Sequence, residues 1–405
     1  MVVAHREPFY VFSVPMNAET PVIAIGLEFP IALRGGVSVL VEELLRGLSD
    51  HYRIVLVSRD RSDTLPASVK PFIAEHIEWN PLTVSRATSS ALAGRLAGLG
   101  VRIAHLHSGG NYGWGNRLPG QSPILFLNKR GIACFSTIHL VVSIFDGYCD
   151  AKKPVWFKAA LLPVAWLGKM QTLRHLRKEL VVSKHGCERV RKWYWPLRDR
   201  FVAVYHSRLK TAAQPAPRAD REPVILCVGH IAFRKGQLVL VEAFARIAEK
   251  HPGWNLLLLG DVLEQSCADA IAQIIREKKL QDRIQLAGPR DDAMEFMQRA
   301  AVFVQPSFFE GLPLALQEAM FCGCTCVATR ISGNTELVDD EKNGLLVAPG
   351  DVAEMAGALD RIISDPEARK MFGRASAVSI LDCGMTAEQM IARHCELYDS
   401  PLATA

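Results

Sequence analysis

The fold is decided by residues 302–328, which read VFVQPSFFEGLPLALQEAMFCGCTCVA. Two apolar runs, Val302–Val304 and Thr325–Ala328, have the length and composition of buried strands. Between them a loop leads into a helical pattern that contains Glu318. A strand, a helix and a second strand in this order predict parallel strands covered by helices.

Apolar runs of the same kind, separated by helical patterns, recur through the chain. In the second half they are Val224–Val228, Leu256–Leu259 and Ile284–Leu286, with a helical run at Val239–Glu249. In the first half they are Val22–Leu27, Arg53–Ser58, Arg102–His107, Ala133–His139 and Leu180–Ser183. The chain has 405 residues, whereas single cores divide beyond about 250–300 residues. The sequence therefore predicts an α/β protein with two parallel-sheet domains.

A change of composition marks the boundary between the two predicted domains. Residues 211–223, TAAQPAPRADREP, are rich in proline and charge and cannot continue a central strand. We predict a first domain over 1–210, this linker, a second domain over 224–380 and a final helical segment over 381–405. Whether that last segment crosses back to the first domain is left open. Two such domains are expected to face each other across a cleft at the carboxyl ends of their strands, where ligands bind.

The composition argues against several classes of partner. The formal net charge is only +5 and no basic stripe is evident, so we expect no nucleic-acid partner. The ten cysteines are scattered through apolar runs and are expected to be reduced. Cys322, Cys324 and Cys326 alternate without a histidine or a second cysteine pair to complete a metal site, so we expect no metal. No secretory signal is evident at the start of the sequence, so we expect a cytoplasmic location.

Two strand-to-helix turns carry groups that suit an anion. Arg34-Gly35-Gly36 precedes a helical pattern, and glycines there let backbone N–H groups approach a phosphate. In VGHIAFRKG, residues 228–236, Arg234 and Lys235 lie beside a predicted helix start. A diphosphate at that position would meet two cations and the positive end of a helix dipole. An ordinary tight turn and a solvated pair of surface charges are the alternatives.

Two acidic residues stand in apolar surroundings in the segment that decides the fold. Glu310 lies in the loop, and Glu318 is expected about two turns into the following helix. A carboxylate near a helix start accepts hydrogen bonds from hydroxyls, and the second can chelate a ribose diol. Capping or surface polarity explains neither residue well, because an unpartnered carboxylate among leucines is costly.

In combination these motifs resemble the family 4 retaining glycosyltransferases, through most of the chain and most clearly in its second half. The resemblance implies a GT-B fold, with two Rossmann-like domains and a nucleotide diphosphate sugar as donor. It also implies roles for residues at matching positions. The implied catalytic residues are His139, Arg234, Lys235 and Glu310. The implied donor-binding residues are Gly35, Gly36, Gly288, Pro289, Arg290, Gly311, Leu312, Pro313 and Glu318. A core histidine is the alternative for His139.

The sequence departs from this family pattern in two places. Where many members carry an Asn-Gly pair after the last strand of the first domain, this chain has Tyr205-His206-Ser207. The first twenty residues precede the usual first strand, and Phe9–Val14 is either an extra strand or an ordered arm.

The segment 151–179, AKKPVWFKAALLPVAWLGKMQTLRHLRKE, is rich in tryptophan, leucine and basic residues. Its apolar part is too short to span a bilayer, but aromatic residues flanked by lysines suit the headgroup region of an anionic membrane. A buried helix pair is the alternative. We favour membrane contact because Lys152, Lys153, Lys158 and Lys169 are hard to bury.

The sequence thus predicts a retaining, metal-independent glycosyltransferase without a cofactor. The resemblance implies a UDP-sugar as the expected donor, with a GDP-sugar as the next choice. The expected acceptor is a glycan or lipid-linked molecule of cell-surface polysaccharide or lipopolysaccharide synthesis, used at the inner face of the membrane. One rival is a sugar synthase or phosphorylase of the same fold with a soluble acceptor. Another is a catalytically silent binding protein. A nicotinamide-dependent dehydrogenase is disfavoured because the glycine fingerprint is missing.

Overall fold

The computed structural model describes residues 20–33, 35–145, 153–213 and 220–403. Arg34, the Phe9–Val14 stretch, residues 151–152 and the middle of the predicted linker lie outside the described residues. By its internal contacts the chain divides into two compact units. Unit 1 comprises Met1–Tyr205 and Glu388–Ala405, and unit 2 comprises His206–Ala387. Each unit is described by itself.

Unit 1 is built on a parallel sheet. Among its described residues, seven strands follow the order β3-β2-β1-β4-β5-β6-β7, and every pair of neighbours runs parallel. The strands are β1 (Val22–Leu27), β2 (Arg53–Ser58), β3 (Glu75–Glu78), β4 (Val101–Ser108), β5 (Ala133–Ile138), β6 (Leu176–Val181) and β7 (Phe201–Ala203). The helices are α1 (Gly36–Leu48), α2 (Arg86–Gly98), α3 (Pro123–Asn128), α4 (Val155–His175), α5 (Lys184–Trp193) and α12 (Ala387–Ala403).

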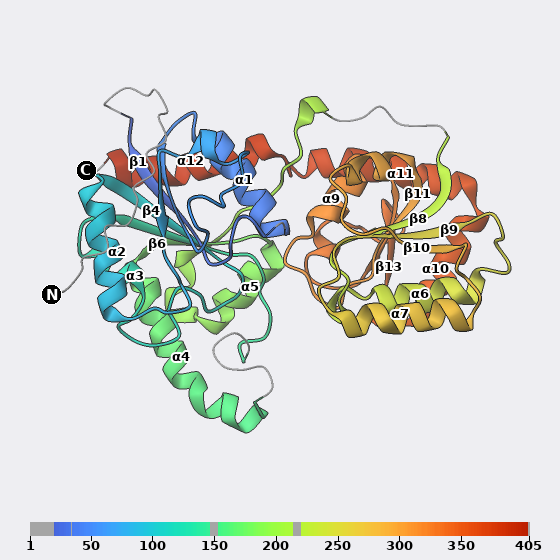
Figure 1. Ribbon diagram of the computed structural model, residues 1–405, viewed down its shortest axis with the longest axis horizontal. Helices are drawn as coiled ribbons and strands as arrows, with labels where there is room; N and C mark the ends of the chain where they lie inside the picture. The colour runs from blue at the N-terminus through green and yellow to red at the C-terminus, as the bar shows by residue number, and fades with distance from the viewer. Residues whose placement is uncertain (1–19, 34, 146–152, 214–219, 404–405) are drawn as a thin grey trace. The chain divides into compact units, whose positions relative to one another are not determined.

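Unit 2 repeats this architecture with its own sheet (Figure 1). In the part that the structure describes, six parallel strands follow the order β10-β9-β8-β11-β12-β13. They are β8 (Glu222–Val228), β9 (Asn255–Leu259), β10 (Ile284–Leu286), β11 (Ala300–Gln305), β12 (Thr325–Thr329) and β13 (Gly344–Val347). The helices are α6 (Gln237–Ile247), α7 (Gln265–Glu277), α8 (Ala293–Arg299), α9 (Leu314–Phe321), α10 (Val352–Ser364) and α11 (Pro366–Asp382).

The strands expected from the apolar runs are present, and the α/β class with two parallel sheets is confirmed. Every residue of β11 and β12 is buried, as expected for strands that are covered by helices on both faces. The core of unit 2 gathers around Phe244, Val302 and Phe372, and that of unit 1 around Leu106, Cys134 and Phe201. In both units, burial of these apolar side chains is the main source of stability.

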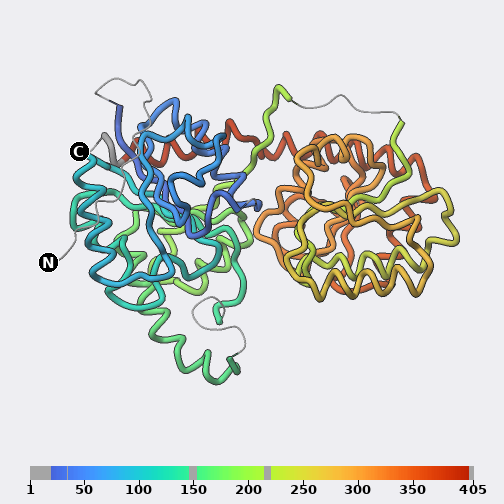
Figure 2. Tube along the Cα trace, in the orientation of Figure 1, coloured from blue at the N-terminus to red at the C-terminus, as the bar shows by residue number. Residues whose placement is uncertain are grey.

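Helix α12 completes unit 1 although it follows all of unit 2 in the chain. The Tyr52 hydroxyl donates to Asp399 Oδ1 at 3.2 Å, and His105 Nδ1 bonds the Tyr398 hydroxyl. Gly47 of α1 faces Ile391 so closely that a Cβ there would lie 2.0 Å from the Ile391 Cδ1 atom. Figure 2 shows this red C-terminal segment beside the blue N-terminal segments. The first unit therefore depends on chain from both sides of the second.

Helix α4 has one exposed half and one buried half, and Pro163 lies inside it. The buried half carries Lys169, whose side chain is 1% exposed. Its Nζ lies 2.6 Å from Glu179 Oε1, and that oxygen also accepts the Ser136 hydroxyl at 2.7 Å. The expectation that Lys169 is hard to bury was wrong, because a carboxylate of β6 neutralises it inside the core. Within the described residues, no helix is long and apolar enough to cross a bilayer.

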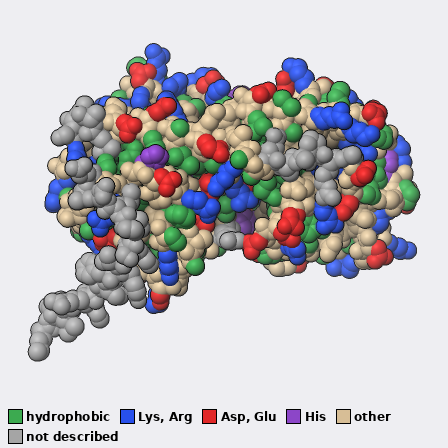
Figure 3. Space-filling model, turned by 90° about the horizontal axis from the view of Figure 1, so that it is seen from above, with side chains coloured by type: hydrophobic (Ala, Val, Ile, Leu, Met, Phe, Trp, Pro, Cys, Tyr) green, Lys and Arg blue, Asp and Glu red, His purple; other side chains and the backbone are tan. Residues whose placement is uncertain are grey.

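Charged residues of both signs lie on the surface (Figure 3), and the cysteines of the segment 322–326 lie in the core. On the face shown in Figure 3, Lys and Arg side chains are interspersed with Asp and Glu side chains. Cys322, Cys324 and Cys326 are buried, and Cys324 Sγ lies 2.8 Å from the Met297 carbonyl oxygen. Burial raises the pKa of the Cys324 thiol to about 11, so it is protonated at neutral pH. These cysteines behave as core residues of unit 2.

We predict that Lys169→Met lowers the free energy of unfolding by about 3–5 kcal/mol, because it leaves the Glu179 carboxylate buried without its partner. Urea denaturation followed by circular dichroism measures this change. The double variant Lys169→Met/Glu179→Leu should recover most of the loss, since it removes both charges. Equal stability of the wild type and Lys169→Met would contradict the prediction.

Candidate functional site

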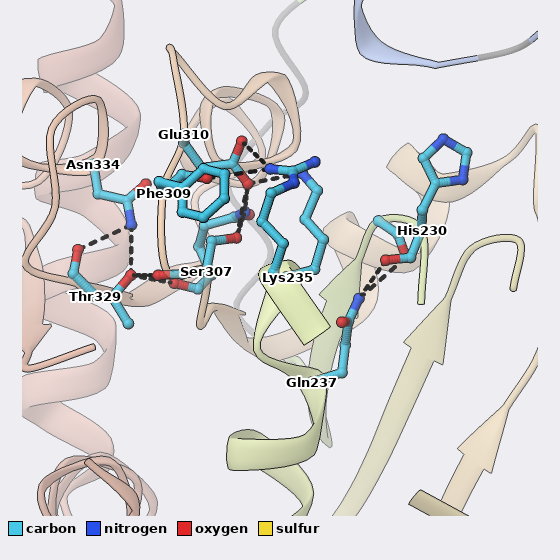
Figure 4. A network of polar contacts seen from close by, with 11 residues as sticks. His230, Lys235, Gln237, Ser307, Phe309, Glu310, Thr329 and Asn334 are labelled. Carbon is cyan, nitrogen blue, oxygen red and sulfur yellow. Dashed lines mark hydrogen bonds and ion pairs between the residues drawn. The ribbon is translucent and has the colours of Figure 1, made fainter. Parts of the chain in front are cut away.

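Glu310 is the centre of a polar network in the loop between β11 and α9 (Figure 4). Its Oε1 atom accepts three hydrogen bonds, from Lys235 Nζ at 2.7 Å, Ser307 Oγ at 2.7 Å and Gln305 Nε2 at 3.1 Å. Its Oε2 atom lies 3.7 Å from Arg234 Nη1. Only 9% of the Glu310 side chain is exposed. The carboxylate is thus held in one orientation by two cations and two neutral donors.

The loop that carries Glu310 is fixed by its neighbours. Thr329 at the end of β12 donates its hydroxyl to the Ser307 carbonyl, and Asn334 donates to the Thr329 carbonyl at 2.9 Å. Gly333 has φ +91°, and a Cβ there would lie 2.5 Å from the Gly311 carbonyl oxygen. Only glycine allows this backbone approach without strain. Sequence reasoning missed these supporting residues, although Ser307 stands near Glu310 at the end of a predicted strand.

The two cations come from the turn between β8 and α6. Gly236 has φ +72° and precedes α6, as expected for a glycine that reverses the chain before a helix. The Arg234 guanidinium donates to the Phe309 carbonyl at 3.2 Å and lies over the Phe309 ring, 5.5 Å from its centroid. Gln237 donates to the His230 carbonyl at 2.9 Å and so ties the same turn to the end of β8. The structure therefore brings Arg234, Lys235 and Glu310 together.

The electrostatics of the site follow from burial and pairing. Burial alone would raise the pKa of the Glu310 carboxyl, but the charges of Lys235 and Arg234 and the hydrogen bonds from Lys235 and Ser307 together lower that pKa below its ordinary value. The carboxylate is therefore ionised at neutral pH. Arg234 and Lys235 together carry two positive charges and Glu310 carries one negative charge. The net charge of about +1 favours an anionic ligand at this turn.

Glu318 lies on α9, in different surroundings. The helix begins at Leu314, because Pro313 lacks an N–H and stands at the N-cap position with an extended backbone. Glu318 is therefore the fifth residue of the helix and lies in its second turn, close to where it was expected. Burial raises the pKa of its carboxyl, and an ion pair with Arg208 opposes the shift. Gly311 and Pro313 are buried between the two acids, and Leu312 is half-buried.

The segment expected to line a nucleotide base follows β10. Gly288 has φ +68°, and its carbonyl accepts the Gly260 N–H at 2.8 Å. This bond joins the ends of β9 and β10. Pro289 and Arg290 are exposed, and Arg290 Nη2 lies 2.7 Å from Asp292 Oδ2. Gly288 itself is half-buried, and the Arg290 side chain is paired within its own loop.

In unit 1, His139 stands just beyond β5 and is 9% exposed. Its backbone N–H donates to the Ser108 carbonyl at 3.1 Å, and its ring Nε2 lies 3.1 Å from His107 Nδ1. The two rings stack with centroids 5.3 Å apart. Burial, assisted by His394, lowers the pKa of His139 to about 3, so the ring is neutral at pH 7. His107 was not recognised from the sequence as a partner of His139.

The glycine turn of unit 1 also stands at a helix start. Gly35 is the N-cap of α1, which begins at Gly36 and has no side-chain cap. The preceding loop is held by Asp60, which accepts the Ile31 N–H at 2.8 Å and the Ala32 N–H at 3.0 Å. The amides of the first turn are therefore free of a side-chain cap at a fixed helix end, where an anion is favoured.

The site of unit 2 has cations and hydrogen-bond acceptors but no cluster of metal-ligating groups. Among residues 20–33, 35–145, 153–213 and 220–403, no group of three or more His, Cys, Asp or Glu is placed to hold a metal ion. The arrangement can stabilise negative charge through Arg234 and Lys235, and can accept hydrogen bonds from hydroxyl groups through its carboxylates.

Residues 210–378 match the family of glycosyl transferases group 1. This glycosyl transferase match covers less than half of the chain and includes Arg234, Lys235, Glu310 and Glu318. The lipopolysaccharide core biosynthesis glycosyltransferase LpsE of Rhizobium meliloti is 34% identical over 170 residues, which are 42% of this chain and 46% of that protein. The chain spans less than half the length of the first curated relatives that it matches.

Solved structures of glycosyltransferases share the fold over nearly the whole chain. A glycosyltransferase from Rickettsia africae has a TM-score of 0.73 at 18% identity, over 96% of this chain and 100% of that one. HepE of Anabaena in complex with UDP has a TM-score of 0.71 at 16% identity, over 93% of this chain and 100% of that one. The GT-B expectation is thereby confirmed for the fold, with its two parallel-sheet α/β units.

We predict that Gly236→Ala disrupts the cationic turn, because the new Cβ would lie 2.0 Å from the Pro306 carbonyl oxygen and φ is +72°. The cost should be at least about 2 kcal/mol in the free energy of unfolding of unit 2. The matched control is Gly253→Ala, since a Cβ at Gly253 would meet nothing within 4 Å. Thermal unfolding of both variants measures the difference, and equal midpoints would refute the prediction.

Proposed function

We propose that the chain is a retaining glycosyltransferase of family 4, which transfers a sugar from a nucleotide diphosphate donor to a glycan or lipid-linked acceptor. The observation that carries this proposal is the arrangement of Lys235 and Arg234 around the buried carboxylate of Glu310, at 2.7 and 3.7 Å. This arrangement lies inside the region that matches the group 1 glycosyl transferases. It supplies cations for a leaving diphosphate and a fixed carboxylate for sugar hydroxyls.

The proposed reaction uses these groups without a resident cofactor or metal. The bond between the sugar carbon and the β-phosphate oxygen breaks, while the acceptor oxygen forms the new bond on the same face of the sugar. The acceptor's proton passes to the leaving phosphate. Arg234 and Lys235 stabilise the negative charge that develops there, and Glu310 orients the donor sugar.

Several further residues are assigned roles in this proposal. Glu318 accepts the ribose hydroxyls, the backbone of Gly288–Arg290 lines the base, and Gly311–Pro313 contacts the donor. In unit 1, the family resemblance assigns Gly35 and Gly36 to the donor diphosphate and His139, as a neutral ring, to the transferred sugar. The pKa of about 3 suits His139 to donate or accept a hydrogen bond rather than to carry charge.

UDP-sugar is the proposed donor, because HepE of Anabaena shares the fold and was solved with UDP. Lipopolysaccharide or another cell-surface glycan is the proposed acceptor class, because LpsE acts in lipopolysaccharide core biosynthesis. The rival with a soluble acceptor uses the same donor site. A silent scaffold would retain the fold without using Arg234 and Lys235 on a donor.

We predict that one nucleotide sugar from a panel of UDP- and GDP-linked sugars binds and is slowly hydrolysed. Arg234→Ala should lower donor hydrolysis by about 10²-fold or more, because it removes charge stabilisation of the leaving group. Glu318→Ala should weaken donor binding through the lost ribose contacts. Calorimetry and detection of the released nucleoside diphosphate measure these effects.

The control for that experiment is Arg276→Ala, which removes an exposed arginine of α7 and should leave binding unchanged. Thermal unfolding of each variant separates loss of binding from loss of structure. If the wild type bound no donor of the panel, the silent scaffold would be favoured over the enzyme.

We also propose that unit 1 contacts the surface of an anionic membrane through the exposed half of α4. This half projects beyond the other helices of unit 1 (Figure 1). Its large exposed apolar side chains are Val155 at 72%, Trp156 at 72%, Leu161 at 37%, Val164 at 41% and Leu167 at 55%. Exposing tryptophan and leucine side chains on one helix to water costs free energy. That free energy is regained when the side chains enter the headgroup layer of a membrane.

Charge supports the same surface. Residues 153–178 contain no Asp or Glu, whereas Lys153, Lys158 and Arg174 are basic. Lys153 lies 5.5 Å from the centroid of the Phe157 ring beside the exposed face. An apolar helix flanked by cations matches the interface of an anionic bilayer. Such a position would bring the enzyme to a lipid-linked acceptor.

We predict that the protein sediments with vesicles containing phosphatidylglycerol and less with phosphatidylcholine alone. Trp156→Ser should weaken this binding about tenfold, because an exposed indole no longer enters the interface. Trp195→Ser is the matched control, since Trp195 is 71% exposed elsewhere in unit 1. Equal sedimentation of both variants, or a dimer that Trp156→Ser abolishes, would contradict membrane contact.

A further inference from the structure

Glu318 has a partner that the family resemblance does not assign. Arg208 Nε donates to Glu318 Oε1, in the segment that follows β7. The Glu318 side chain is 7% exposed and that of Arg208 is 34% exposed. Both residues belong to unit 2, so the pair lies within one compact body. Arg208 directly follows Tyr205-His206-Ser207, the place where the sequence departs from the family pattern.

The backbone around Arg208 is fixed against α9 and the end of unit 2. Gln317, the neighbour of Glu318, donates its side-chain amide to the His206 carbonyl at 3.1 Å. The Leu209 N–H bonds the Ser207 hydroxyl at 3.2 Å, and the Leu209 carbonyl accepts the Ala387 N–H at 2.7 Å. His206, Ser207 and Leu209 are all buried. The guanidinium is therefore presented to Glu318 from an ordered segment rather than from a loose linker.

The electrostatic surroundings make this partner important. Burial raises the pKa of Glu318, and Arg208 is the cation that opposes this shift by its charge and its hydrogen bond. Cys322, which directly follows the last residue of α9, also interacts with Glu318, but burial raises the pKa of its thiol, which is neutral at physiological pH. Arg221 acts on Cys322 rather than on Glu318. Without Arg208 the acid would have no cation among the described groups that act on it.

We infer that Arg208 is a positioning residue for the nucleotide donor, which orients the Glu318 carboxyl group through its hydrogen bond so that it can accept both ribose hydroxyls. The inference rests on the proposed function, since Glu318 is the proposed ribose ligand. A carboxylate accepts two hydroxyl hydrogen bonds, whereas a protonated acid offers one donor and fewer acceptor sites. Arg208 favours the ionised form of Glu318 against the effect of burial, and that form is the better acceptor for the ribose hydroxyls.

The probe for this inference is UDP, measured by calorimetry from pH 5 to pH 9. Arg208→Ala should bind UDP about 10- to 100-fold more weakly than the wild type at pH 7, the range for a hydrogen bond to a charged group. Part of the affinity should return as the pH rises and Glu318 ionises. Arg208→Lys should restore much of the affinity at pH 7, because lysine restores the positive charge although it lacks the planar guanidinium group.

A double-variant comparison distinguishes action through Glu318 from a direct contact with the nucleotide. In a Glu318→Gln background, Arg208→Ala should cause little further loss of affinity, since the group it acts on has gone. Arg246→Ala is the matched control, because it removes an exposed arginine of α6. If the losses of UDP affinity from Arg208→Ala and Glu318→Gln were fully additive, the inference would be overturned. Tighter UDP binding by Arg208→Ala would also overturn it, because it would mean that Arg208 competes with the nucleotide for Glu318.

Stability against pH tests the pair without any nucleotide. A carboxyl group whose pKa is higher in the folded than in the unfolded state destabilises the fold as the pH rises from the unfolded pKa to the folded pKa. Arg208→Ala raises the folded pKa further, so its deficit in stability should be small near pH 4.5 and larger at pH 7. If the wild type binds no UDP but this pattern is observed, the proposed function fails while the pairing stands. A deficit that does not change with pH would overturn the pairing.

Discussion

The most demanding constraint in unit 2 is the burial of the Glu310 carboxylate. A carboxylate with 9% exposure is stable only if cations and donors surround it. That requirement explains why a positive-φ glycine places Lys235 and Arg234 beside it, and why Ser307 and Gln305 turn their polar groups toward one oxygen. The surrounding strands supply a rigid frame, because β11 and β12 are buried along their whole length. The two cations that offset the free-energy cost of burying Glu310 also leave the site with a net positive charge.

Much of this fold could be predicted from the sequence because parallel strands covered on both faces appear as uninterrupted apolar runs. Ten of the thirteen strands in the described residues overlap those runs, whereas the short strands β3, β7 and β13 were not predicted. Lys235 and Glu310 could be chosen as site residues because each follows a strand at the edge where ligands bind. Their direct pairing could not be predicted, since it depends on the side-chain geometry of two loops 75 residues apart.

Other features were hidden for definite physical reasons. The start of α9 at Leu314 follows from the extended backbone of Pro313, which the sequence pattern alone did not specify. The burial of Lys169 could not be foreseen, because its partner Glu179 stands ten residues away on a strand. The contact between His107 and His139 joins two neighbouring strands whose order in the sheet is not written in local periodicity. Both side-chain pairs depend on how neighbouring elements pack, which the local sequence pattern does not specify.

The return of α12 to unit 1 has a consequence for the order in which the protein is made. Residues up to Tyr205 leave the ribosome first, but their unit also needs Glu388 and the residues beyond it. Unit 2 can therefore reach its final form while unit 1 still lacks the helix that covers His105 and the Gly47 surface of α1. During that interval, Tyr52 and His105 of unit 1 lack the α12 side chains with which they form hydrogen bonds. Unit 1 therefore completes its core only after all of unit 2 has been synthesised.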